Sequence, residues 1–111
     1  MTIKLISYSI KHQPEPPADY HFDCRALPNP YTQAELRPLD GRHPKIIEYL
    51  KAQNGTARTL DYAMKAVMKQ GAKTIAFGCH GGKHRSVALA EIFATQLGEI
   101  GIKTEIEHLA L

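Results

Sequence analysis

The feature that most constrains this chain is a glycine-rich basic run, Gly78–Ser86 (GCHGGKHRS), set between an apolar strand and an apolar helix. The stretch Lys73–Gly78 has the length and composition of a short buried strand. Ser86–Glu99 carries apolar residues over most of a helical surface, which indicates a helix packed on more than one side. The alternating stretch Ile102–His108 then predicts a strand with one solvent-exposed face. A strand, a helix and a strand in succession predict a βαβ unit, which implies a parallel pair with a right-handed crossover.

Periodicity and chain breakers predict the remaining elements. Prolines exclude regular structure from His12–Ala18 and from Leu27–Tyr31, and Gly71 is a natural helix stop. The expected order β-β-α-α-β-α-β makes an α/β domain with a small mixed sheet and a C-terminal βαβ unit. The earlier elements are expected as strands at Ile3–Ile10 and Tyr20–Cys24 and helices at Pro44–Ala52 and Thr56–Gln70.

Length and composition favour a single domain over residues 1–111. The chain is 43% hydrophobic and 23% charged, within the ordinary globular range. Its first ten residues are too short and too polar for a signal peptide or a membrane span. Two cysteines, Cys24 and Cys79, cannot make a disulfide framework and fit a reducing compartment. We therefore expect a cytoplasmic protein with no membrane partner.

The basic run has the chemistry of a phosphate loop. The first amides of a helix lack intrahelical acceptors and carry a partial positive charge, so an anion placed there accepts their hydrogen bonds. Gly81 and Gly82 can adopt positive φ and let backbone amides converge. Arg85 can fork onto phosphate oxygens, and Ser86 can cap the helix or donate a hydroxyl. The alternative is a structural turn with a solvated basic face. A net charge of +3 is too mild for a dedicated nucleic-acid binder, so we expect a local positive patch.

The same run reads Cys-x5-Arg-Ser, which resembles the phosphate loop of cysteine-dependent phosphatases. In that reading Cys79 is the nucleophile, Arg85 holds the phosphate and Asp23 is the candidate general acid. The alternative is that Cys79 is a small residue closing a buried strand. We favour binding over catalysis, so an enzymatic role stays a second hypothesis.

A zinc site is the third chemistry to weigh. Side chains that could in principle coordinate the ion lie in the run and at two distant histidines: Cys79, His80, His84, His21 and His108. Lys83 and Arg85 would sit beside the cation and repel it, and no second cysteine pair exists. We expect neither a metal nor another cofactor.

The chain resembles the C-terminal domain of the RNase adapter protein RapZ and its nucleotide-binding relatives. The likeness covers nearly the whole chain and is carried by three stretches in the family's order: 21–31 (HFDCRALPNPY), 36–41 (LRPLDG) and 78–87 (GCHGGKHRSV) with Ala90 and Glu91. RapZ proteins place a P-loop domain before this one. The Gly-x-x-x-x-Gly-Lys-Ser/Thr motif is absent here, so a free-standing copy is expected and nucleotide hydrolysis is not carried over.

The resemblance implies a sensor rather than an enzyme. The family domain is similar to a sugar-phosphate-binding subdomain of phosphofructokinase, senses glucosamine 6-phosphate, binds a small regulatory RNA and self-associates, so a homodimer is expected. The ligand-binding residues implied here belong to the run and to the end of the second strand: Cys79, His80, Gly81, Gly82, His84, Arg85, Ser86, Asp23 and Arg25. For Asp23 and Arg25 the alternative is a buried ion pair that orders the following loop.

Two departures from the family pattern bear on function. His80 stands where the family usually has a small hydroxyl residue, which changes the size and pH response of the pocket. The C-terminus lacks the basic tail that follows the matching histidine, His108, in many RapZ proteins, which puts RNA binding in doubt. We interpret His108 as a core histidine, and Tyr31 as packing over the proline loop rather than contacting ligand.

Overall fold

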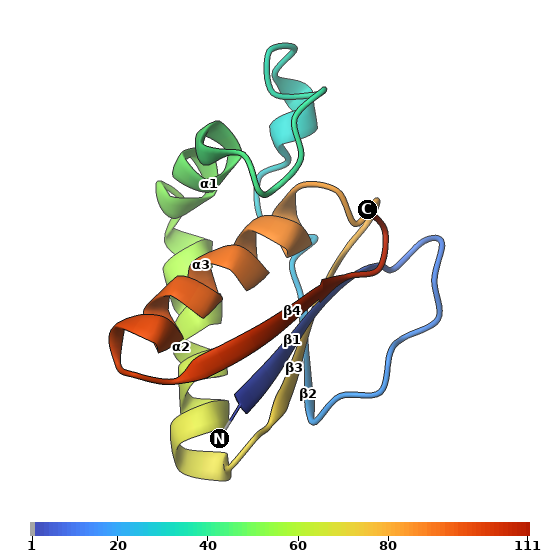
Figure 1. The fold of residues 1–111 in the computed structure, drawn as a ribbon. Coiled ribbons are helices and arrows are strands. Elements are labelled where there is room, and N and C mark those ends of the chain that lie inside the picture. Colours follow the sequence, from blue (N-terminus) through green and yellow to red (C-terminus); the bar gives the residue numbers. More distant parts are fainter. Residues whose placement is uncertain (1) are drawn as a thin grey trace.

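Four strands and three α-helices make up the computed structural model, which describes residues 2–111 (Figure 1). The elements agree with the sequence expectation in order and lie within about two residues of the expected bounds. The strands are β1 Thr2–Ser9, β2 Tyr20–Asp23, β3 Thr74–Cys79 and β4 Lys103–His108. The helices are α1 Pro44–Lys51, α2 Asn54–Gln70 and α3 Arg85–Glu99, with one 3-10 turn at Pro30–Thr32.

The sheet is entirely parallel, in the order β2-β3-β1-β4. The α/β class and the C-terminal βαβ unit are confirmed, whereas the expected mixed sheet is corrected. β3 and β4 do not pair with each other, because β1 lies between them and pairs with both. β1 can take this central place because its residues Ile3, Leu5 and Ile6 are buried on both faces of the sheet. The proline-rich segment 10–19 carries the chain across to the far edge, where β2 joins β3 in parallel.

The helices cover one face of the sheet, and the segment 10–19 lies on the other side (Figure 1). The helix side holds the main core, in which Phe77 packs edge-on against Phe93 of α3. The opposite face holds a small cluster built from Ile6, Tyr8 and Ala76. None of the helices in residues 2–111 has the length and apolarity needed to cross a membrane.

Local chemistry explains most of the helix ends. Pro44 occupies the first turn of α1, and the His43 ring accepts a hydrogen bond from the Lys45 amide at 3.1 Å. Gly71 ends α2 with a left-handed φ of 70°, as expected of a helix stop. Helix α2 begins two residues before the expected start and includes Gly55. A Cβ at Gly55 would lie 2.7 Å from the Leu27 side chain, so glycine there leaves room for Leu27.

Candidate functional site

A cavity of about 350 Å³ opens at the carboxyl end of β3, beside the start of α3. In open parallel α/β sheets, ligands bind at this end of the strands. The loop between β3 and α3 supplies most of the wall, and the segment after β2 supplies the rest. The lining residues are Asn29, Tyr31, Cys79, His80, Gly81, Lys83, His84 and Arg85.

The backbone of this loop presents hydrogen-bond donors that the fold does not use. Within residues 2–111, none of the amides from Gly81 to Val87 donates to a protein acceptor. Gly82 has a left-handed φ of 69° and packs against Ser9, where a Cβ would meet the Ser9 amide nitrogen at 2.9 Å. Gly81 has no positive φ, contrary to the expectation for both glycines, and a Cβ there would meet nothing within 4 Å. Gly81, Lys83, His84 and Arg85 of this run also line the cavity, where an anion can accept from unpaired amides.

Arg85 is buried and fixed in place. Its Nη1 donates to the carbonyl oxygens of Arg25 at 2.9 Å and Leu27 at 3.1 Å. Among the described residues, Nε and Nη2 have no protein acceptor. The side chain therefore braces the segment after β2 and, at the same time, holds a positive charge in the cavity wall.

His84 precedes α3 as its N-cap residue and is only 6% exposed. Burial lowers the pKa of its ring, and the positive charge of Lys83 acts in the same direction. The backbone carbonyls of Leu39, Arg37 and Leu36 oppose that shift without cancelling it. His84 is therefore a neutral member of the cavity wall near neutral pH. Its Nε2 is buried with no hydrogen-bond partner among the described residues.

Cys79 and Ser86 meet beneath the loop. Their side chains are buried, and Sγ of Cys79 lies 3.1 Å from Oγ of Ser86. Cys79 lines the cavity, whereas Ser86 does not. Helix α3 begins at Arg85, so Ser86 lies inside its first turn rather than at the cap.

Asp23 and Arg25 lie in a neighbouring cavity of about 210 Å³, together with Tyr8 and Glu15. The two side chains form a bidentate ion pair, with Arg25 Nη2 donating to Asp23 Oδ2 at 2.7 Å. Hydrogen bonds from Arg25 hold the pKa of the Asp23 carboxyl below its usual value. The fold thus brings Asp23 and Arg25 to a cavity next to the loop, but neither residue lines the main cavity. The pair is about half exposed, unlike the buried pair of the alternative interpretation.

Tyr31 and Asn29 line the cavity although sequence reasoning left them out of the site. Asn29 Oδ1 accepts from the Tyr31 amide at 3.1 Å and fixes the 3-10 turn. The Tyr31 ring is 58% exposed and stacks with the guanidinium of Arg37, which lies 5.0 Å from the ring centre. More than half of the Tyr31 side chain is thus open to solvent beside the cavity. The sequence did offer one indication of this role, because Tyr31 ends the stretch 21–31, the first of the three stretches that resemble the RapZ family.

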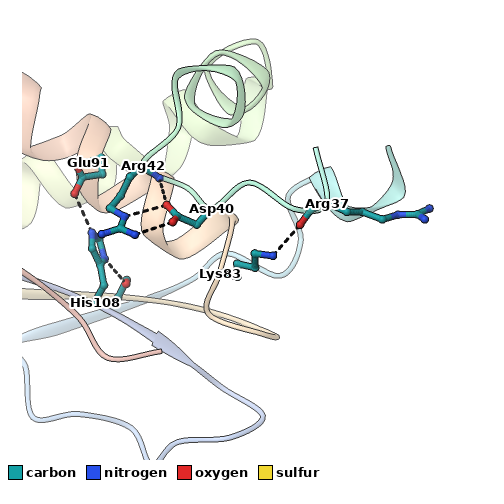
Figure 2. Close-up of polar contacts among 7 residues, drawn as sticks. Arg37, Asp40, Arg42, Lys83, Glu91 and His108 are labelled. Carbon is teal, nitrogen blue, oxygen red and sulfur yellow. Dashed lines mark hydrogen bonds and ion pairs between the residues drawn. The ribbon is translucent and has the colours of Figure 1, made fainter. Parts of the chain in front are cut away.

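Separate polar contacts lie around the loop, the segment before α1 and the end of β4 (Figure 2). Lys83 Nζ donates to the Arg37 carbonyl at 2.8 Å, which ties the loop to the segment before α1. Arg42 pairs with Asp40 at 2.8 Å and lowers the pKa of the Asp40 carboxyl to about 2. Within residues 2–111, no three His, Cys, Asp or Glu side chains converge as metal ligands.

His108, also labelled in Figure 2, is a core histidine, as predicted. Its side chain is largely buried, its Nδ1 is bonded to the Ser7 hydroxyl, and its Nε2 lies 2.9 Å from Glu91 Oε2. The contacts join the last strand to β1 and to α3.

Comparison with known proteins gives matches over the whole chain. A family model described as the RapZ C-terminal domain matches residues 1–111. A nucleotide-binding protein of Thermobifida fusca is 38% identical over 94% of this chain, which corresponds to 38% of that protein. Nucleotide-binding proteins of Stenotrophomonas maltophilia and Jannaschia sp. are 41% and 39% identical, over 86% and 97% of this chain and 35% and 37% of their own lengths. The chain therefore spans well under half the length of these curated relatives.

Proposed function

The chain belongs to the RapZ C-terminal domain family, and on that premise we propose that it binds a phosphorylated small metabolite as a sensor domain. The observation that carries the proposal is the run of unpaired amides from Gly81 to Val87, part of which lines the cavity. The relatives are called nucleotide-binding proteins, a name that fits a phosphorylated ligand and describes proteins much longer than this chain.

The chemistry of the wall favours a phosphate over other anions. Unpaired amides donate to several oxygens at once, and the fixed guanidinium of Arg85 adds a full positive charge. The wall carries the positive charges of Arg85 and Lys83, while His84 is neutral near pH 7, and this charge suits a phosphomonoester rather than a polyphosphate with several further charges. A volume of about 350 Å³ lies at the small end of the range for ligand pockets.

We take glucosamine 6-phosphate as the reference ligand, because the family resemblance implies it. The exposed ring of Tyr31 offers an apolar surface against which a sugar ring can pack. The phosphate would then lie over the amides of the loop, and the amine and hydroxyl groups would face the outer wall.

Calorimetric titration with glucosamine 6-phosphate tests this proposal. Gly81→Glu places a carboxylate in the cavity wall at a position with open space, so the loop need not rearrange. Gly98→Glu is the matched control, because Gly98 also has open space around its Cα and lies in the last turn of α3. We expect binding by the wild type and Gly98→Glu, and at least a tenfold weaker affinity in Gly81→Glu because like charges repel. Equal affinity in all three proteins would contradict the assigned pocket.

A cysteine-dependent phosphatase is the second candidate function, favoured by the 3.1 Å contact between Cys79 Sγ and Ser86 Oγ. A hydroxyl in that position can stabilise a thiolate that attacks phosphorus. The candidate acid Asp23 is held by Arg25 in the neighbouring cavity, which weakens this hypothesis. Reduced wild type and Cys79→Ser should be incubated with a chromogenic phosphomonoester. Turnover that disappears in Cys79→Ser would establish the activity, and no turnover in the wild type would exclude it.

RNA and a second copy of the chain are the partners that the family resemblance implies. For RNA, a gel-shift series at increasing salt is the appropriate test, because counterion release makes phosphate-driven affinity fall steeply with salt. A complex seen at low salt that weakens in this way supports RNA binding, and no shift at low salt rejects it. Sedimentation of the purified chain reports the homodimer.

A further inference from the structure

The two free cysteines lie opposite each other at the ends of neighbouring strands. Cys79 ends β3, and Cys24 directly follows β2. The parallel register pairs Phe22 with Phe77 and Asp23 with Gly78. The Cys24 amide donates to the Gly78 carbonyl at 2.7 Å, which holds Cys24 against the end of β3. Extending the register by one residue past Asp23 and Gly78 places Cys24 beside Cys79.

Both thiols point to the same face of the sheet. Phe22 and Phe77 stack on the helix side with ring centres 5.8 Å apart, and side chains two residues further along each strand return to that side. Accordingly, Cys24 and Cys79 are buried in the same core cluster. Neighbouring strands lie about 4.8 Å apart, inside the Cα separation of roughly 4.4–6.8 Å that a disulfide requires.

We propose that Cys24 and Cys79 form a reversible disulfide that makes the phosphate loop sensitive to oxidation. Cys79 is the point of entry, because it lines the cavity and a small oxidant can reach it from there. Cys24 is fully buried and serves as the resolving thiol. Burial raises the pKa of the Cys24 thiol, so Cys24 is protonated at neutral pH and is not the sulfur that reacts first.

The reaction needs one hydroperoxide molecule and balances in two steps. With hydrogen peroxide, the Cys79 sulfur attacks one oxygen, the O–O bond breaks, and Cys79 sulfenic acid and water are formed. The Cys24 sulfur then attacks the Cys79 sulfur, the S–O bond breaks, and the thiol proton leaves with the hydroxyl group as a second water. Each cysteine loses one electron, and the peroxide gains two.

The disulfide would change the loop through its first residue. Cys79 Sγ now contacts Ser86 Oγ in the first turn of α3, and bonding to Cys24 removes that contact. The start of the loop would be drawn toward the end of β2, away from the geometry that presents its amides. We therefore expect weaker phosphate binding in the oxidised protein, a consequence that rests on the proposed function.

Mass spectrometry tests the disulfide without reference to any ligand. Reduced wild type is treated with a modest excess of hydrogen peroxide, denatured, alkylated and digested with trypsin. We expect the intact chain to lose two hydrogen atoms, and peptides 12–25 and 74–83 to be recovered as one cross-linked species that a thiol reductant separates. Recovery of both peptides only as alkylated or over-oxidised monomers would overturn the proposal.

Two variants complete the test. Cys79→Ser and Cys24→Val each remove one partner. Valine is chosen at Cys24 because that site lies in the apolar core, where the polar hydroxyl of serine could prevent folding. We expect neither variant to give the intramolecular loss of two hydrogen atoms. If the same loss occurs in either variant, the assignment of the pair is wrong. If reduced wild type fails to bind glucosamine 6-phosphate but still forms the cross-link, only the proposed function is contradicted.

Discussion

Arg85 joins the fold and the site in one side chain. Sequence reasoning assigned it to a phosphate, and its place in the cavity wall is compatible with that role. What sequence could not predict is that Nη1 is already used by the carbonyls of Arg25 and Leu27. Arg25 lies 60 residues and Leu27 58 residues before Arg85 in the chain, so only the tertiary structure reveals these two acceptors.

Arg85→Ala is expected to lower the free energy of unfolding by about 1–3 kcal/mol, because two buried carbonyl oxygens lose their donor. Urea unfolding measures the loss. Arg25→Ala is the matched control, since its side chain forms an exposed ion pair and should contribute much less. Equal losses in the two variants would show that Arg85 does not brace the segment after β2.

His84 gives a prediction on pH. Its pKa is lower in the folded chain than the ordinary value of 6.5, so below that pH the unfolded chain binds a proton that the folded chain does not. Stability therefore falls as the pH drops below about 6.5 and levels out once the folded pKa is passed. Urea unfolding between about pH 7.5 and 5 should show a steeper fall in the wild type than in His84→Gln. Parallel curves would contradict the burial of a neutral ring.

At the scale of elements, Gly41 fixes the segment before α1 against the start of α3. Its amide donates to the Lys83 carbonyl at 2.8 Å, and a Cβ there would lie 2.5 Å from both the Ala88 nitrogen and the His84 oxygen. Because these are backbone atoms, they cannot move aside cheaply. Gly41→Ala should destabilise the chain by about 1–3 kcal/mol, measured by thermal or urea unfolding.

Gly98→Ala is the control for that substitution, since nothing lies near the added Cβ. Alanine is the better helix former, so a neutral or slightly stabilising effect is expected there. If Gly41→Ala is as well tolerated as Gly98→Ala, the contact between the segment and α3 is looser than the distances indicate.

His108 ties the edge strand β4 to its neighbours. It bonds to the Ser7 hydroxyl on β1 and to Glu91 on α3, so His108→Ala leaves the buried Ser7 hydroxyl without a partner. We expect a loss of about 1–3 kcal/mol in the free energy of unfolding. The same substitution at the exposed His12 should have no measurable effect. Amide exchange that stays slow in β4 of His108→Ala would contradict this role.

Element positions were largely predictable, whereas strand order was not. Proline and glycine set the limits of the helices, as at Pro44 and Gly71, and apolar periodicity indicated their buried faces. Strand pairing depends on contacts far apart in the sequence, such as Leu5 with both Ile75 and Ile106. Local patterns carry no information on such pairs, which is why a mixed sheet was expected where a parallel one formed.

On the scale of the whole molecule, the parallel sheet explains where the site lies. All four strands point the same way, so the loop after β3 and the segment after β2 emerge at one edge. The main cavity and the smaller cavity of Asp23 and Arg25 are both built there. The sequence predicted the loop correctly but assigned Asp23 and Arg25 to the same pocket. Knowing that two strand ends are adjacent does not reveal which side chains line the same cavity.

The central claim is that an anion is held by the backbone amides between β3 and α3. Amide NMR spectra of the reduced chain, recorded while glucosamine 6-phosphate is added, test it most directly. We predict that the largest shifts and the strongest new protection from exchange occur at amides between Gly81 and Val87, with little change along β4. Saturable binding whose largest shifts instead fall outside this loop, for example around Pro38–Pro44, would contradict the account.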